Sequence, residues 1–176
     1  QRKPADSVSW YRPHLETSLA LLRRAGLSPA SRVIDVGAGA STLVDDLLEL
    51  GVGHVTVLDL SAQALSLARA RIGEHAGSVT WLAADLLAAP LPEGAFDLWH
   101  DRAVLHFLID PDDVARYAQQ AFRAIRPGGR AVIGGFAPDG PDRCSGLPVA
   151  HRSPEEVASL LGPAFRLLDT LHERHI

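Results

Sequence analysis

A glycine-rich turn that follows a short β-branched run constrains the fold of this chain more than any other feature. Residues 32–36 are typical of a buried strand, and Gly37 and Gly39 follow directly. Glycine suits this place because a tight turn needs its conformational freedom, and its missing Cβ lets the backbone approach a ligand. Apolar residues at helical spacing then predict a helix over residues 42–50, which Gly51 ends. This order predicts the first half of a βαβ unit.

Strand-like and helix-like segments alternate along the rest of the chain. Such alternation predicts an α/β fold, doubly wound around a mostly parallel sheet. We expect residues 1–176 to form a single domain, because they contain no repeat, linker or low-complexity stretch. The predicted strands are residues 32–36, 54–59, 78–83, 96–100, 131–136 and 164–171, and the predicted helices are about 14–25, 42–50, 61–72, 110–126 and 153–161.

Composition excludes several classes of protein. The net charge of −4 argues against nucleic-acid binding, which usually needs a basic surface. No apolar run approaches the ~20 residues that span a bilayer, and the first residues lack the apolar core of a signal peptide. Cys144 is the single cysteine, which excludes an internal disulfide and a cysteine-based metal cluster. The cytoplasm is therefore the expected location.

Three interpretations of the glycine-rich turn compete: a dinucleotide site, an S-adenosylmethionine site and a purely structural turn. Asp35 ends the preceding strand, where a carboxylate would repel a pyrophosphate but could accept hydrogen bonds from a cationic amino group. Ser41 occupies the helix entry, where a dinucleotide loop needs a third small residue. Asp59, at the end of the next strand, is placed to bind ribose hydroxyls in either cofactor, although an aspartate there also commonly caps a turn.

Four motifs in order resemble those of the class I S-adenosylmethionine-dependent methyltransferases, over nearly the whole chain. They are VIDVGAGAST at residues 33–42, TVLDLS at 56–61, the segment from Ala84 to Leu86 followed by PLPEGAFDLWH, and FRAIRPGGRAVI at 122–133. The Arg-Pro-Gly-Gly turn is the most discriminating match, whereas the usual third glycine of the first motif is replaced by Ser41. The resemblance implies a Rossmann-like methyltransferase that uses S-adenosyl-L-methionine and releases S-adenosyl-L-homocysteine.

The resemblance also implies which residues line the cofactor. Asp85 would bind the adenine amino group, with the backbone of Leu86 nearby, and Leu60 would flank the adenine ring. The full set of expected cofactor-binding residues is Asp35, Gly37, Ala38, Gly39, Ser41, Asp59, Leu60, Asp85, Leu86, His100 and Tyr11.

Chemistry is expected where the fourth strand ends. In open α/β sheets ligands bind beyond the carboxyl ends of the strands, which points to His100 and Asp101. His100 would contact the methionine part of the cofactor, and Asp101 or His106 would orient or deprotonate a substrate. If a helical turn follows Asp101, Arg102 and His106 share one face. The alternative is an Asp–Arg ion pair that only stiffens this turn.

Two further segments are expected to recognise substrate. Residues 1–30 would form an N-terminal lid and helix, with Trp10 and Tyr11 closing over the cofactor or simply anchoring the segment. Residues 137–152 lack periodicity, and loops of that length tend to be functional. The candidate substrate residues are Trp10, Arg102, Arg143, Cys144 and His151.

The methyl acceptor is expected to be a small molecule, with a protein side chain as the second choice. The alternative function is that of an NAD(P)-dependent oxidoreductase. No metal is proposed, because Asp101 and Asp139 are too few carboxylates for a metal centre. The family usually closes its sheet with an antiparallel seventh strand. Since the sequence ends at Ile176, we expect that strand to be missing from this chain.

Overall fold

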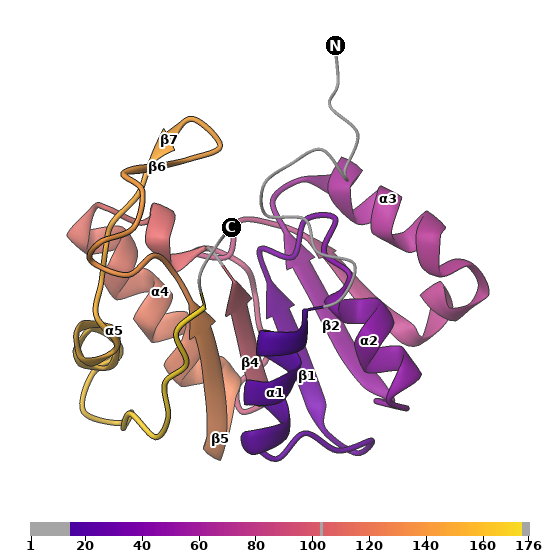
Figure 1. Cartoon of the computed structure of the whole chain (residues 1–176). Coiled ribbons are helices and arrows are strands. Elements are labelled where there is room, and N and C mark those ends of the chain that lie inside the picture. Colours follow the sequence, from indigo (N-terminus) through magenta and orange to yellow (C-terminus); the bar gives the residue numbers. More distant parts are fainter. Residues whose placement is uncertain (1–14, 103, 174–176) are drawn as a thin grey trace.

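Five parallel strands form the central sheet, in the order β3-β2-β1-β4-β5 (Figure 1). The computed structural model describes residues 15–102 and 104–173. The winding reverses between β1 and β4, which places a binding crevice at the carboxyl ends of these two strands. The strands are β1 (Arg32–Val36), β2 (His54–Asp59), β3 (Val79–Ala83), β4 (Phe96–Arg102) and β5 (Ile125–Gly134). The predicted doubly wound α/β class is confirmed.

Helices cover both faces of the sheet. Side chains of a strand alternate between its faces, so the neighbours Val33 and Ile34 enter different apolar clusters. The cluster of Val33 includes residues of α1, α2 and α3, and the cluster of Ile34 includes residues of α4, with residues of α5 packed against it. The helices are α1 (Glu16–Arg24), α2 (Leu43–Glu49), α3 (Ala62–Ile72), η2 (Gly73–Ser78), η3 (Leu105–Phe107), α4 (Pro111–Ala124) and α5 (Pro154–Leu161). No helix of the described residues is long and apolar enough to cross a membrane.

Three helices begin at the residues that the sequence predicts. The Ser61 hydroxyl accepts the amide of Ala64 at 3.2 Å, and the Asp110 carboxylate accepts the amide of Asp112 at 2.8 Å. Ser153 and Glu156 form the reciprocal capping box at the start of α5. Side-chain oxygens thus satisfy the first free amides of all three helices, which is why these boundaries are readable from sequence.

The fourth and fifth strands differ from their predicted bounds. β4 continues two residues past His100 and ends at Arg102, so Arg102 and His106 do not share a helical face as predicted. β5 begins at Ile125 and includes the Arg-Pro-Gly-Gly segment, with an irregular register opposite Phe96 and Leu98. A side chain at Gly129 would lie 2.6 Å from Ile125 Cγ2 and 3.0 Å from the Asp97 carbonyl oxygen. Glycine therefore lets this segment pair with β4 where a turn was expected.

The strand predicted over residues 164–171 is wrong. This segment is irregular, and its leucines Leu167 and Leu168 are 41% and 58% exposed. Asp169 instead pairs with Arg24 at the end of α1, at 2.9 Å. A strand needs a neighbour to satisfy its amides, and among the described strands the sheet ends at β5. Without such a partner, the apolar pattern of the segment does not become a strand.

The structure describes the two segments that were expected to recognise substrate, residues 1–30 and 137–152, to different extents. The predicted helix at residues 14–25 is found as α1, whereas Trp10 and Tyr11 lie outside the described residues. Residues 137–152 contain a short hairpin, β6 (Arg143–Cys144) with β7 (Leu147–Pro148), that the sequence analysis missed (Figure 1). Its Ser-Gly turn has both residues at positive φ, 51° and 84°, and this dipeptide was the available signal.

Candidate functional site

The glycine-rich turn after β1 lies against the end of β2 and the segment after β4. The amides of Gly37 and Ala38 donate to the carbonyl of Leu58 at 2.8 and 3.3 Å. Gly37 has a φ of +65°, and a Cβ there would fall 1.9 Å from Val104 Cγ2. Only glycine fits this position, because both the backbone conformation and the space exclude a side chain. The residues that follow β4 therefore lie in direct contact with the loop.

Asp59 ties the same loop to the end of β2. Its Oδ2 accepts the amide of Gly39 at 2.7 Å, and its Oδ1 accepts the amide of Ser61 at 2.7 Å. Both a ligand role and a capping role were expected for this aspartate, and its contact with the Ser61 amide is of the capping kind. Leu60 beside it is 77% exposed, which leaves an apolar surface open at this edge.

A buried chain of hydrogen bonds joins β1, β4 and α1. His100 Nδ1 lies 2.7 Å from Asp35 Oδ1, and His100 Nε2 lies 2.9 Å from the hydroxyl of Ser18. Asp35 and His100 are only 2% and 1% exposed, and Asp35 Oδ2 has no partner among the described residues. Buried carboxylate oxygens nearly always accept hydrogen bonds, so this atom is suited to a donor supplied by a ligand.

Asp85, Leu86 and Ser41, three further residues expected to bind the cofactor, also lie at the carboxyl edge. Asp85 follows β3 and accepts the amide of Leu87 at 2.9 Å, while the carbonyl of buried Leu86 accepts the side-chain amide of Gln120 at 2.8 Å. The Ser41 hydroxyl accepts the amide of Leu43 at 3.2 Å, at the entry to α2. The structure thus gathers the loops after β1, β2 and β3 on one edge, as a ligand that crosses them would require.

Asp101 lies at the centre of a second buried network. Its Oδ1 accepts the amide of Val104 at 2.7 Å, and its Oδ2 accepts the amide of Leu105 at 3.1 Å. The Tyr117 hydroxyl donates to Oδ2 at 2.6 Å and accepts the indole N–H of Trp99 at 3.2 Å. Burial raises the pKa of Asp101, and burial together with the Asp101 charge raises the pKa of Tyr117 well above its usual value. These contacts fix the turn after β4, and a substrate role for Asp101 stays a prediction.

His106 lies on that turn, in η3, and is only 4% exposed. Its ring stacks on Phe136 with centroids 5.0 Å apart and meets Phe107 edge-on at 4.2 Å. Neither ring nitrogen has a hydrogen-bond partner among the described residues. Burial, assisted by the charge of Arg152, lowers the pKa of His106 to about 4, so the ring is neutral at physiological pH.

The candidate substrate residues of the segment 137–152 contact their own segment. Arg143 Nη1 donates to the carbonyl of Gly146 at 2.7 Å, and Cys144 pairs with Leu147 across the hairpin. His151 Nε2 lies 2.9 Å from the carbonyl oxygen of Pro141. Their roles toward a substrate stay predictions, because these contacts only shape the hairpin.

Sequence reasoning missed several residues on which the site depends. Ser18 and Tyr117 reach the site from α1 and α4, and neither belongs to a motif. Phe136 and Arg152 contact the His106 turn from the segment after β5. The only available signal was the placement of Arg152 in a long loop, since its partners are backbone carbonyls that no sequence pattern identifies.

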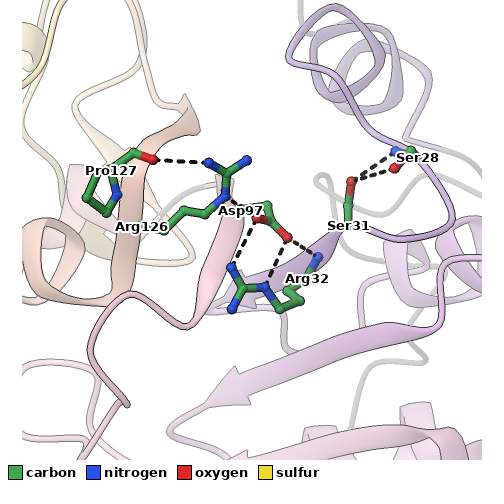
Figure 2. Close-up of polar contacts among 6 residues, drawn as sticks. All are labelled: Ser28, Ser31, Arg32, Asp97, Arg126 and Pro127. Atoms are coloured by element: carbon green, nitrogen blue, oxygen red, sulfur yellow. Dashed lines mark hydrogen bonds and ion pairs between the residues drawn. The ribbon is translucent and has the colours of Figure 1, made fainter.

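An ion cluster lies at the opposite, amino-terminal edge of the sheet. Figure 2 shows Asp97 of β4 between Arg32 and Arg126, whose guanidinium groups both donate to it. Asp97 Oδ2 also accepts the amide of Arg32 at 2.7 Å, and the Arg32 hydrogen bonds hold the pKa of Asp97 well below its usual range. A hollow of about 270 Å³ adjoins this cluster. The cluster joins the first residues of β1, β4 and β5, far from the glycine-rich turn.

No group of three or more histidine, cysteine, aspartate or glutamate side chains among the described residues is arranged to hold a metal ion.

Curated relatives of the chain are methyltransferases. The ubiquinone/menaquinone biosynthesis C-methyltransferase UbiE of Methylobacterium nodulans is 32% identical over 102 residues, which cover 56% of this chain and 39% of the relative. The O-methyltransferase cnsE of Penicillium expansum is 32% identical over 142 residues, which cover 77% of this chain and 49% of the relative. The chain thus spans about two fifths to one half of the length of these relatives.

A solved structure similar to this chain is also that of a methyltransferase. The 1,6-didemethyltoxoflavin-N1-methyltransferase of Burkholderia thailandensis, bound to 1,6-didemethyltoxoflavin and S-adenosylhomocysteine, matches with a TM-score of 0.68 and 28% identity. The match covers 85% of this chain and 65% of that enzyme. A family model described as a methyltransferase domain matches residues 33–129, more than half of the chain. These findings do not favour the oxidoreductase alternative, and the chain belongs to the methyltransferase domain family.

Proposed function

We propose that this protein transfers a methyl group from S-adenosyl-L-methionine to a small-molecule acceptor. The observation that carries the proposal is the unpartnered, buried Oδ2 of Asp35 beside the turn of Gly37 and Gly39. A cationic amino group would satisfy this oxygen through a charge-assisted hydrogen bond, whereas the phosphates of a dinucleotide would be repelled by the carboxylate. The methionine part of the proposed cofactor carries such an amino group.

The other residues at this edge fit an adenosine. The Asp59 carboxylate accepts two amides in this structure, and a carboxylate has about four lone-pair positions, so it retains capacity for ribose hydroxyls. The exposed side chain of Leu60 would cover the adenine ring, and Asp85 would accept its amino group. Ala38 and Ser41 would contact the cofactor from the loop after β1, and Leu86 would contact it from the segment after β3.

His100 is proposed to act through Asp35. Both of its ring nitrogens contact protein atoms, Asp35 on one side and Ser18 on the other. The imidazole would fix the carboxylate so that Oδ2 points to the incoming amino group. This makes His100 a positioning residue, which refines the predicted contact of His100 with the methionine part. The roles of Asp101 and Tyr11 in binding or catalysis stay predictions.

The acceptor is proposed to be a small molecule because one relative is named for ubiquinone/menaquinone biosynthesis and a similar solved structure holds 1,6-didemethyltoxoflavin. The bound sulfonium supplies an electrophilic methyl carbon, and methyl transfer is mainly a matter of alignment in a pocket without water. A protein side chain as acceptor remains the second candidate. The exclusion of nucleic acid and the cytoplasmic location stay predictions from the sequence.

Isothermal titration tests the cofactor assignment. The protein is titrated with S-adenosylhomocysteine and, separately, with NADH, and we expect saturable binding of the first ligand only. Asp35→Asn should weaken S-adenosylhomocysteine binding about tenfold or more, which corresponds to about 1.4 kcal/mol. Asp113→Asn is the matched control, because Asp113 lies on α4 and only approaches Arg116 at 3.6 Å. Binding of NADH without binding of S-adenosylhomocysteine would overturn the proposal.

A further inference from the structure

His106 has an environment that a structural histidine seldom has. The ring is buried against Phe136 and Phe107, yet neither nitrogen has a partner among the described residues. Leaving a buried polar group without a hydrogen bond costs about 1–3 kcal/mol. A phenylalanine would fill a similar volume without this cost, so packing does not explain why an imidazole occupies the position.

The backbone that precedes His106 is held by side chains of β4 and α4. The Asp101 carboxylate accepts the amides of Val104 and Leu105 at 2.7 and 3.1 Å. The hydroxyl of Tyr117 fixes that carboxylate in turn. The two residues that precede the imidazole are therefore anchored to β4 and α4.

Arg152, in the segment after β5, donates hydrogen bonds to the same turn. Its Nη1 donates to the carbonyl of Leu105 at 2.7 Å, and its Nη2 donates to the carbonyl of Leu108 at 2.5 Å. The amide of Ala150 donates to the carbonyl of His106 itself at 2.7 Å. The backbone around His106 thus has hydrogen-bond partners on both sides, whereas its two ring nitrogens have none among the described residues. Such an arrangement is typical of a preorganised functional group.

The turn lies beside the proposed cofactor loop. Val104 fills the space above Gly37, and a Cβ built on Gly135, just after β5, lies 3.7 Å from His106 Cβ. The imidazole therefore lies at the carboxyl ends of β4 and β5, next to the switch in strand order, where an acceptor would approach the glycine-rich loop. Residues 150–152 lie over this turn, because the amide of Ala150 and the guanidinium of Arg152 donate to its carbonyls.

We propose that His106 receives the proton of an O–H or N–H nucleophile in the acceptor, which rests on the proposed methyltransferase function. The acceptor is then a planar molecule with a phenolic, enolic or ring N–H group, which stacks beside Phe136. The lone pair of the nucleophile forms the bond to the methyl carbon, and the carbon–sulfur bond breaks with its electron pair going to sulfur. The nucleophile's proton passes to a ring nitrogen of His106, and from the imidazolium to water.

The electrostatics of the site agree with this role. Burial and the nearby charge of Arg152 lower the pKa of His106 and keep the ring neutral, so it can accept a proton. A weakly basic imidazole is sufficient here, because an oxygen that is gaining a methyl group becomes a strong acid. The transfer therefore proceeds late, as the new bond forms.

Nitrogen-15 NMR of the histidine rings tests the inference without any turnover. Phenol is titrated into the labelled protein at millimolar concentrations, with anisole as the matched probe that lacks the O–H group. We expect phenol to shift a ring-nitrogen resonance of His106 saturably and anisole to leave it unchanged. The resonance is assigned by its loss in His106→Phe, and exposed His75 in η2 is the internal control. Equal shifts with both probes, or no shift with phenol, would overturn the inference.

A second measurement separates this inference from the cofactor assignment. His106→Phe and His106→Gln should bind S-adenosylhomocysteine within about twofold of the wild-type affinity, because the inference gives His106 no contact with the cofactor. If wild-type protein binds no S-adenosylhomocysteine, the proposed function fails, whereas the phenol titration still decides whether His106 contacts a protic ligand. A loss of cofactor affinity in both variants would count against the acceptor role.

Discussion

His100 Nδ1 lies 2.7 Å from Asp35 Oδ1, across two neighbouring strands that are far apart in the sequence. The parallel pairing of β1 and β4 places the two residues directly opposite one another. The hydroxyl of Ser18, which contacts His100 Nε2, comes from α1, and α1 packs against one face of the sheet. One buried chain of hydrogen bonds therefore joins the first helix, the first strand and the fourth strand at the proposed cofactor site.

Replacing His100 should destabilise the fold and weaken cofactor binding together. His100→Phe leaves neither oxygen of the buried Asp35 carboxylate with a partner among the described residues, which should cost about 3 kcal/mol of unfolding free energy. Ser18→Ala removes only the contact to Nε2 and should cost about 1 kcal/mol. Urea unfolding measures both values. If both variants lose the same unfolding free energy, the contact of His100 with Asp35 contributes no more stability than its contact with Ser18.

Two glycine replacements separate backbone strain from steric conflict. Gly37 and Gly51 both have positive φ, +65° and +76°, but only a side chain at Gly37 would meet another atom, Val104 Cγ2. Gly51→Ala should cost about 1 kcal/mol from backbone strain alone. Gly37→Ala should cost more in urea unfolding and should also reduce S-adenosylhomocysteine binding. If the two variants are equally stable, the side chain of Val104 does not exclude a side chain at residue 37.

The unfolding free energy should depend on pH through His106. Its pKa is about 4 in the folded state against 6.5 in the unfolded chain, so the unfolded chain binds the proton first as the pH falls. The contribution of His106 is therefore complete above pH 6.5 and is lost between pH 6.5 and 4, with a slope of at most about 1.4 kcal/mol per pH unit. His106→Phe should flatten the curve in this window. An unchanged slope in the variant would show that the ring titrates normally.

The ion cluster at the amino-terminal edge should contribute modestly to stability. Asp97→Asn removes the charge that Arg32 and Arg126 share, and we expect a loss of about 1 kcal/mol at pH 7, because both arginines are near half exposed. The pKa of Asp97 is lowered, so its contribution is present above the unfolded value of 3.8 and is lost as the pH falls below it.

Chemical unfolding at pH 7 and pH 3 measures the difference between Asp97→Asn and wild type. Asp113→Asn is the control, since its ion pair with Arg116 is exposed and longer, at 3.6 Å. If Asp97→Asn lowers the unfolding free energy no more than Asp113→Asn does, the ion cluster does not stabilise the fold.

The sequence alone determined most of the local elements and their order, although not the bounds of β4 and β5, the β6–β7 hairpin or the segment 164–171. β1 and β2 have the predicted bounds, and the caps Ser61, Asp110 and Ser153 begin their helices as expected. These features depend on neighbours within a few residues, because capping and strand periodicity are local physics. The glycine-rich turn by itself left three interpretations open, and the methyltransferase family was indicated by the resemblance of four motifs in order.

Only the tertiary structure decided how side chains pair across the sheet. The partners of His100, Asp101 and His106 come from α1, α4 and the segment after β5, and no local pattern encodes such contacts. Tertiary structure also decided the segment 164–171. Its apolar pattern suits a strand, but no described strand lies beyond β5 to pair with it. Strand formation and buried hydrogen bonds both require a partner that is distant in sequence, and the fold alone supplies it.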